Sequence, residues 1–173
     1  MTAPHRVRLT KIDGRTVVPA GAVRVDRGSR WRPPFWLDHP FVDFLISWKR
    51  LIDNRDSRYA MLAHGYRLWI GRDYFEGLIW DAFTSRWFDQ KPPAAPTEDE
   101  IQHRLGGRVL ADWPELGIPC LGDVLLSIAN RREDGSLFPT ASDGFRPKAR
   151  PLTEGELASH RRVMAYTNAK YAW

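Results

Sequence analysis

The sequence predicts a small α/β or α+β fold in which helices pack on a small sheet. Three observations lead to this expectation. The chain has 173 residues, which suits one core domain. Its 43% hydrophobic and 27% charged residues are typical of a folded globular chain and exclude disordered and fibrous classes. Short β-like segments alternate along the chain with amphipathic helical segments, which favours layers of strands and helices.

The N-terminal part is predicted to form strands. Residues 5–9 alternate polar and apolar side chains, and the pair Asp13-Gly14 offers a tight turn before residues 16–18, so we expect a hairpin. Residues 22–26 form a second short β-like run. Residues 27–40 contain three prolines and are expected to form an extended loop.

The middle of the chain is predicted to be helical. Apolar residues at spacings of three and four follow Pro40, which suits a first helical turn, and predict an amphipathic helix. Residues 58–70 and 73–88 predict two more helices. Residues 90–96 contain three prolines and form the clearest linker, and residues 97–100 have the spacing of a capping box before another short helix.

The remaining segments complete the predicted architecture. Residues 108–112 are strand-like, and residues 123–130 have one apolar face and predict a helix. We therefore expect an α/β core over residues 1–131, a flexible linker over 132–152 and a C-terminal helix over 153–173. A second capping-box spacing at the start of the last segment favours that helix.

Cysteine usage and hydropathy indicate a soluble, cytoplasmic protein. Cys120 is the only cysteine, so an intramolecular disulfide and a cysteine-based zinc site are both excluded. No apolar run approaches the roughly 20 residues that span a bilayer. The first 15 residues are basic and lack the apolar stretch of a signal peptide. We expect no membrane partner, no cofactor and no metal.

The charge is unevenly distributed. Residues 1–35 carry a net charge of +6, residues 36–130 carry −4 and residues 131–173 carry +3. Basic ends attract polyanions, which favours a phosphate-bearing ligand or nucleic acid. However, 21 of the 26 basic residues are arginine, and a GC-rich genome raises arginine content without any functional demand. A solvated basic surface is therefore the alternative.

Two segments carry a resemblance to a known family. Residues 21–35 read GAVRVDRGSRWRPPF, and residues 110–126 read LADWPELGIPCLGDVLL. They resemble the signatures V-x-V-x-R-x-S-(K/R)-W-G-N-P-F and L-x-C-W-C…P-C-H-x-D-V-L of a phage and bacterial family, domain of unknown function 4326. The resemblance spans residues 21–130 and implies a shared fold and a bacteriophage origin, with the cytoplasm of the host cell as the location.

The chain departs from these signatures at several positions. Arg32-Pro33 stands in place of Gly-Asn. Asp112, Pro114 and Leu121 stand where the family has two cysteines and a histidine. Cys120 is the position that remains. The resemblance therefore supports a shared fold better than a shared activity.

The loop after residue 26 is a candidate ligand site. Arg27, Ser29 and Arg30 combine guanidinium groups with loop N–H groups, which bind phosphate or carboxylate. Trp31 and Phe35 follow closely, and an aromatic face beside a cation can stack a nucleobase whose phosphate is neutralised nearby. The alternative is that Trp31 and Phe35 fill the core, while Arg27 and Arg30 pair with Asp26 or with the acidic middle helices.

A second group of candidates surrounds the start of the last core helix. The positive end of that helix is expected to lower the thiol pKa of Cys120. A nucleophile would also need a base, and no motif ties a histidine to it, so a buried inert thiol is the alternative. Asp123 lies in the first helical turn and Asp112 at the strand end. These two carboxylates could divide acid and base duties in one cleft, although opposition to the helix dipole alone explains Asp123.

These observations predict a phage-type protein that binds a nucleotide or nucleotide-derived ligand. If it is an enzyme, we expect transfer or hydrolysis at a glycosidic or phosphate bond, with Arg27 and Arg30 binding the anion and Asp123 or Asp112 as acid or base. One alternative is a non-catalytic module whose basic ends bind DNA or RNA. Another is a phage accessory protein that binds a host protein through exposed aromatic side chains.

Overall fold

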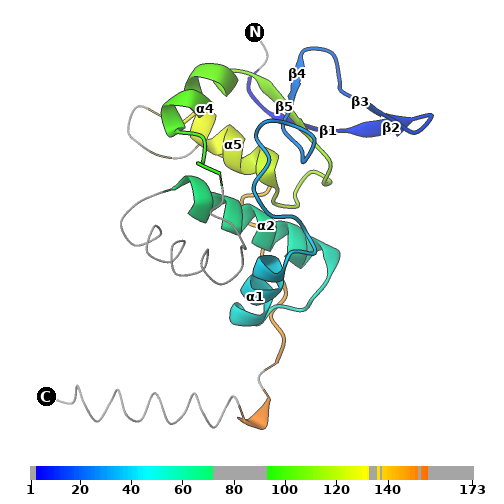
Figure 1. The fold of residues 1–173 in the computed structure, drawn as a ribbon, viewed down its shortest axis with the longest axis vertical. Helices are drawn as coiled ribbons and strands as arrows, with labels where there is room; N and C mark the ends of the chain where they lie inside the picture. Colours follow the sequence, from blue (N-terminus) through cyan, green and yellow to red (C-terminus); the bar gives the residue numbers. More distant parts are fainter. Residues whose placement is uncertain (1–2, 72–92, 133–135, 137, 152, 156–173) are drawn as a thin grey trace, which may run out of the picture.

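The computed structural model describes residues 3–71, 93–132, 136, 138–151 and 153–155, and these form the predicted mixture of helices and small sheets. In chain order the described elements are β1 (Arg6–Arg8), β2 (Thr10–Ile12), β3 (Arg15–Val17), β4 (Ala22–Arg24), α1 (Pro40–Trp48), α2 (Arg55–Ile70), α4 (Glu98–Leu105), β5 (Val109–Asp112) and α5 (Leu121–Ala129). Figure 1 shows α5 between the sheet and α2, with α1 on the far side of α2.

Three short strands form a parallel sheet in the order β1–β5–β4. Leu110 of β5 pairs with Arg6 on one side and with Val23 on the other, so β5 is the central strand. The backbone pairing continues past β4, where the N–H of Val25 donates to the carbonyl of Ala111 at 3.0 Å. Because all three strands run in the same direction, their carboxyl ends meet at one edge, which is where open α/β sheets bind ligands.

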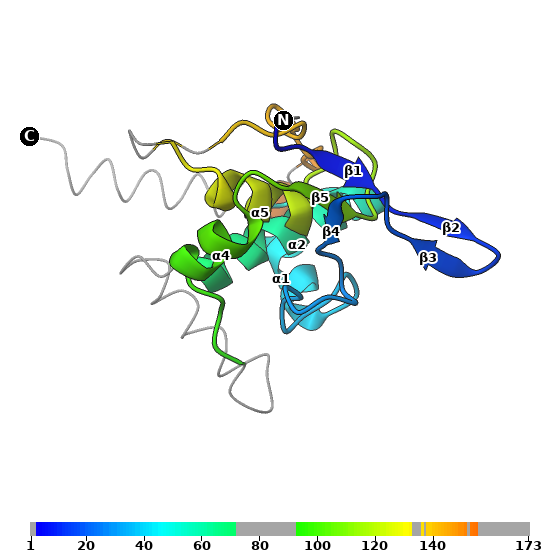
Figure 2. The same cartoon turned by 90° about the horizontal axis from the view of Figure 1, so that it is seen from above.

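The predicted hairpin is confirmed at its turn but not over its whole length. Asp13 and Gly14 have positive φ angles of 49° and 75°, the conformations that a two-residue hairpin turn requires, and they join β2 to β3. The expectation that residues 5–9 also belong to the hairpin is wrong, because β1 pairs with β5. Polar and apolar alternation indicates a strand but not its partner. Figure 2 shows the β2–β3 hairpin projecting from the sheet.

The helices begin close to their predicted starts. The side chains of His39, Asn54 and Thr97 each accept a backbone N–H bond at the beginning of α1, α2 and α4. Such bonds satisfy donors that a helix leaves free in its first turn. α2 begins at Arg55, three residues before its predicted start, and α5 begins at Leu121, two residues before.

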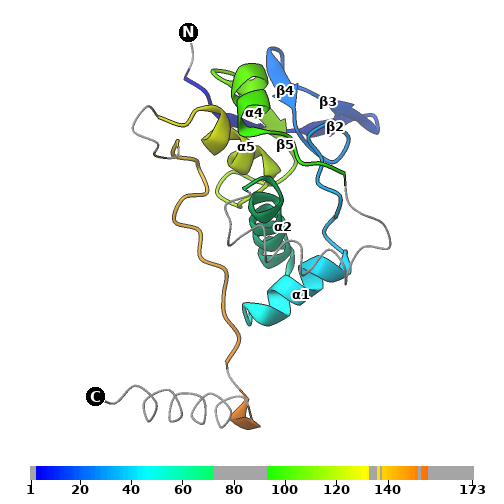
Figure 3. The same cartoon turned by 60° about the vertical axis from the view of Figure 1, so that its left-hand side comes forward.

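The core lies between the sheet and the helices. Every residue of α5 is buried, because this helix contacts the sheet, α4 and α2 (Figure 3). Trp31 and Phe35, from the loop after β4, also belong to the core. The hydroxyl of Tyr66 donates to the carbonyl of Trp31 at 2.6 Å and holds that loop on α2. A Cβ at Gly65 would lie 2.8 Å from the Phe41 ring, so this close packing requires glycine.

The segment predicted as a flexible linker contacts the core where it is described. Phe145 packs against the core cluster, and the N–H of Ile52 donates to the carbonyl of Lys148 at 2.8 Å. The chain therefore passes along the junction between α1 and α2 before it leaves the described part. The predicted helix at residues 73–88 and most of the one at 153–173 lie outside the described residues.

Candidate functional site

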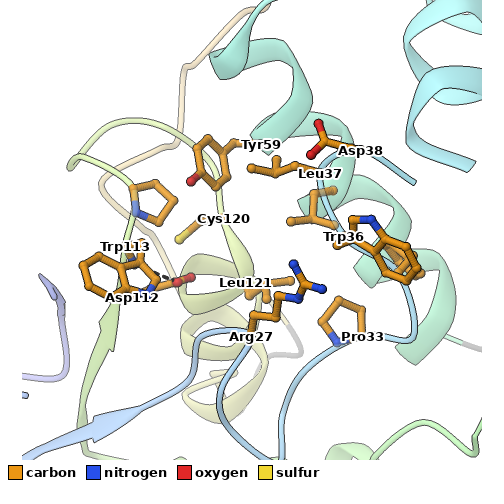
Figure 4. Close-up of a pocket in the computed structure, with 13 residues that line it drawn as sticks. Arg27, Pro33, Trp36, Leu37, Asp38, Tyr59, Asp112, Trp113, Cys120 and Leu121 are labelled. Carbon is orange, nitrogen blue, oxygen red and sulfur yellow. Dashed lines mark hydrogen bonds between the residues drawn. The ribbon is translucent and has the colours of Figure 1, made fainter. Parts of the chain in front are cut away.

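A pocket of about 280 Å³ opens where the parallel strands end, and we call it the strand-end pocket. Its walls come from the loop after β4, the first half of α2 and the segment between β5 and α5 (Figure 4). Four predicted site residues line it: Arg27, Phe35, Asp112 and Cys120. The loop and the strand end, which are about 80 residues apart in sequence, therefore form one site.

Aromatic side chains form much of the pocket wall. Phe35, Trp36, Tyr59 and Trp113 all line it. The guanidinium of Arg27 lies 5.4 Å from the centre of the Trp36 ring and points toward the middle of the pocket (Figure 4). Within the described part of the chain, no carboxylate forms an ion pair with Arg27, so its positive charge is available to a ligand.

Asp26 fixes the position of Trp113 in the pocket wall. Its Oδ2 accepts the indole N–H of Trp113 at 2.7 Å, and its Oδ1 accepts from Nε of Arg24 at 2.6 Å and from the N–H of Gly28 at 3.1 Å. Burial opposes ionisation of Asp26, but these hydrogen bonds and the Arg24 charge outweigh it, so the pKa of Asp26 lies below its ordinary value. One buried carboxylate therefore links the loop after β4 to the segment after β5.

Asp26→Asn should lower the free energy of unfolding at pH 7 by about 1–3 kcal/mol, because three donors lose a charged acceptor. A carboxyl with a lowered folded-state pKa contributes stability above its unfolded pKa of about 3.9, and loses it as the pH falls through the folded value. The difference between wild type and variant should therefore shrink in urea titrations at pH 3. Asp13→Asn, at the exposed hairpin turn, is the matched control and should change stability by less than about 0.5 kcal/mol. A difference that stays constant with pH would contradict this role.

Asp112 joins the end of β5 to the start of α5. Its Oδ1 accepts the N–H of Trp113 at 2.8 Å, and its Oδ2 accepts the N–H of Gly122 at 3.0 Å. A Cβ at Gly122 would lie 2.9 Å from Cδ of Arg6 and 3.2 Å from Cβ of Asp112, so this approach requires glycine. Asp112 lines the strand-end pocket, but both of its oxygens hold backbone groups in place.

Asp123 does not line the strand-end pocket. Its Oδ1 accepts from Nε of Arg6 at 2.9 Å, and both side chains are almost completely buried. Arg6 also donates to the carbonyl of Pro114 at 2.7 Å. Burial raises the pKa of Asp123, although Arg6 opposes this effect. Asp123 lines a second cavity that Cys120 separates from the first, so the predicted pair with Asp112 is divided between two cavities.

The Cys120 thiol is buried between these two carboxylates. Its Sγ lies 3.6 Å from Oδ2 of Asp123, and the side chain lines both cavities. Burial raises the pKa of the thiol well above its ordinary value, and the charges of Asp112 and Asp123 raise it further. The expected lowering of this pKa is wrong, because burial and the two nearby carboxylates raise it. The contacts agree with the alternative of an inert thiol.

The other predicted loop residues lie outside the strand-end pocket. Ser29 closes a turn within its own loop through its hydroxyl group. The guanidinium of Arg30 pairs with Glu100 of α4. Trp31, like Phe35, is buried in the core. These contacts agree with the alternative in which the two aromatic rings fill the core and an arginine pairs with an acidic middle helix.

Three residues of this site are not evident from sequence. Tyr59 reaches the pocket from α2, and its spacing along the helix gives no signal of a site. Trp113 follows a predicted strand directly, and that position at a strand end could have singled it out. Asp26 was considered only as an ion-pair partner of neighbouring arginines, whereas it also orients the Trp113 ring.

In the described ranges, no three His, Cys, Asp or Glu side chains are grouped so that they could hold a metal ion. Over those same residues, no helix combines the length and the apolar character needed to span a bilayer.

Comparisons with protein-family models, with curated proteins and with solved structures found no match to this chain. The resemblance of residues 21–35 and 110–126 to family 4326 therefore stays a prediction. The function has to be argued from the geometry of the site.

Proposed function

We propose that this protein binds a nucleotide or nucleotide-derived small molecule in the strand-end pocket. The observation that carries the proposal is the pairing of Arg27 with Trp36 at the mouth of an aromatic-lined pocket beyond the carboxyl ends of a parallel sheet. Open α/β sheets bind ligands at this edge. The combination of flat rings and one unpaired guanidinium suits a molecule with a planar base and an anionic group.

The aromatic rings supply the site for the base. Trp36 is 42% exposed, although it is a large apolar side chain in contact with Arg27 and His39, so part of its ring surface is available for stacking. Trp113 is held by its bond to Asp26 and does not have to be ordered when a ligand binds. Stacking of a base on an aromatic side chain contributes about 1–3 kcal/mol.

The polar groups of the pocket match the rest of such a ligand. Arg27 is the cation of the lining, and guanidinium binds a phosphate group through two parallel hydrogen bonds. Asp38 also lines the pocket. Its Oδ1 lies 3.7 Å from Nη1 of Arg58, but the side chain is exposed, so its carboxylate can still accept hydrogen bonds from ribose hydroxyl groups. The volume of about 280 Å³ lies just below the usual range for ligand pockets, about 300–1,000 Å³, which favours a ligand no larger than a mononucleotide.

The ion pairs favour a small ligand over a nucleic-acid strand. Half of the basic side chains in residues 1–35 are paired with carboxylates, namely Arg6 with Asp123, Arg8 with Glu115, Arg24 with Asp26 and Arg30 with Glu100. Asp26 is already counted in the net charge of +6, and the other three carboxylates come from outside the segment and reduce that charge further. Binding along a nucleic-acid backbone depends on such charges being free to replace counterions.

The proposal is for binding and not for transfer or hydrolysis. Both oxygens of Asp112 accept backbone N–H bonds, and Asp123 lies in the other cavity with Arg6. Neither carboxylate is arranged as an acid or base beside Arg27.

Arg27→Gln should weaken the binding of AMP by about 10-fold to 100-fold, because hydrogen bonds to charged groups contribute about 1.5–3 kcal/mol. Isothermal titration calorimetry with AMP and with adenosine measures this effect, and the affinity for adenosine should change little. Arg32→Gln is the matched control, since Arg32 is exposed in the same loop and does not line the pocket. Equal losses in the two variants would contradict the proposal.

Salt dependence separates this proposal from nucleic-acid binding. The affinity for AMP should fall only slightly between 50 mM and 200 mM salt, because one phosphate is neutralised. Duplex or single-stranded DNA bound through many phosphates would lose about 10³-fold or more over that range. If AMP, UMP and ADP-ribose give no heat and only DNA binds, the nucleic-acid module replaces the proposed function.

A further inference from the structure

A second cavity, of about 470 Å³, lies between α2, α5 and residues 142–146, and we call it the α2/α5 cavity. Cys120 lines both this cavity and the strand-end pocket, and it is the residue that the two linings share. Arg27 and the aromatic wall belong only to the strand-end pocket. The proposed nucleotide site therefore leaves the α2/α5 cavity without a role.

Basic side chains enter the α2/α5 cavity from two opposite elements. His64 and Arg67 are three residues apart on α2, so they share one face of that helix. Arg146 reaches the cavity from the segment that follows α5. Neither guanidinium forms an ion pair with a carboxylate of the described residues.

The carboxylates that line this cavity are engaged elsewhere. Asp123 is paired with Arg6 at 2.9 Å. Asp143 accepts both the N–H and the hydroxyl of Thr140 at 2.9 Å. The charge of Asp123 is balanced by Arg6. Arg67 and Arg146 then face the single negative charge of Asp143, so the lining keeps an excess of one positive charge.

The surroundings of His64 are also positive. Burial lowers the pKa of His64, and the charges of Lys49 and Arg67 lower it further. A neutral imidazole still offers an N–H donor to an anion. The cavity lining thus includes two forked cationic donors and a ring donor, from α2 and from the segment after α5. Nη1 of Arg146 also donates to the carbonyl of Phe145 at 2.9 Å, and both arginines are exposed.

We propose that the α2/α5 cavity is a binding site for a phosphate group, held by Arg67, Arg146 and His64. Guanidinium groups on opposite walls bind the oxygens of one phosphate from different directions, and the imidazole binds another oxygen. The group comes either from free inorganic phosphate or from a small phosphate ester. This site does not rest on the proposed nucleotide site.

The test is a double variant, Arg67→Gln with Arg146→Gln, titrated calorimetrically with inorganic phosphate and with glycerol 3-phosphate. The affinity for at least one of the two probes should fall by about 10-fold to 100-fold. The control is Arg15→Gln with Arg132→Gln, which removes the same charge from two exposed arginines outside this cavity and should leave the affinity unchanged. Preference for one probe identifies the source of the phosphate group.

Arg27→Gln separates this site from the strand-end pocket. Phosphate binding should be intact in Arg27→Gln, whereas AMP binding through the strand-end pocket should be intact in the Arg67/Arg146 double variant. Circular dichroism and urea titration of each variant establish that it is folded before it is titrated. The proposal would be overturned if the wild type bound neither probe. It would also be overturned if the charge-matched control lost as much affinity as the Arg67/Arg146 double variant.

Discussion

Replacing Arg6 with Met should lower the free energy of unfolding by about 3–5 kcal/mol, the usual cost of removing one partner from a buried ion pair. Nε of Arg6 donates to Asp123 at 2.9 Å, and its terminal nitrogens donate to the carbonyls of Pro114 at 2.7 Å and Glu115 at 2.8 Å. The variant leaves the Asp123 carboxylate and these carbonyl oxygens without their donor. Urea unfolding at pH 7 measures the loss.

Two further variants test the reason for this loss. Arg8→Met removes an arginine from the same strand, but Arg8 is exposed and its pair with Glu115 is 3.5 Å long, so the change should be below about 1 kcal/mol. Adding Asp123→Leu to Arg6→Met removes the buried charge and should recover part of the stability. Equal losses for Arg6→Met and Arg8→Met would show that burial of the pair is not the cause.

Trp31→Ala should lower the free energy of unfolding by about 3–5 kcal/mol, because it removes a large side chain that is 4% exposed in the core. Trp36→Ala, five residues further on, removes a ring that is 42% exposed and should change stability by less than about 1 kcal/mol. For AMP binding we expect the opposite order, with the larger effect from Trp36→Ala. Loss of Trp36 should weaken AMP binding by about 1–3 kcal/mol, the usual contribution of base stacking.

Urea unfolding and AMP titration of the two tryptophan variants give a direct comparison. Trp31 and Trp36 lie in the same loop and are the same residue type, so their difference isolates the effect of position. A Trp31→Ala protein that is as stable as wild type but fails to bind AMP would contradict the core assignment. A Trp36→Ala protein that binds AMP normally would exclude this ring from the site.

Local patterns predicted most of the fold. The spacing of apolar residues after Pro40, the Asp13-Gly14 turn and the capping residue Thr97 each depend on neighbours within one or two turns of chain, and each is present in the structure. The pairing of β1 with β5 could not be predicted in this way, because the two strands are about 100 residues apart.

The burial of charged side chains was the second feature that could not be predicted from the sequence. In residues 5–9 the alternation places Val7 and Leu9 inside and Arg6 outside, yet Arg6 is buried and Val7 is half-buried. The reason is Asp123, which lies 117 residues later in the chain and supplies the charge that makes burial of a guanidinium acceptable. No local pattern reveals such a partner.

The candidate site was predicted only in part, because contacts between residues far apart in the sequence also decide which side chains line it. The loop after β4 and the strand end before Cys120 were both identified, and the structure brings them together around one pocket. Which loop residues face that pocket depends on the core. Trp31 and Phe35 are drawn inward by apolar burial and Arg30 is engaged by Glu100, so Arg27 is the basic residue of the loop that lines the pocket.

The central position of β5 affects how this protein emerges during translation. Both flanking strands are complete by residue 24, but their shared partner begins only at residue 109. Until then β1 and β4 have no strand between them, and Arg6 lacks the carboxylate and carbonyl groups that come from residues 114–123. Closing so long a loop costs conformational entropy before the stabilising contacts of β5 with β1 and β4 can form. A nascent chain that has not yet reached residue 109 therefore carries two unsatisfied strand edges and an unpaired arginine.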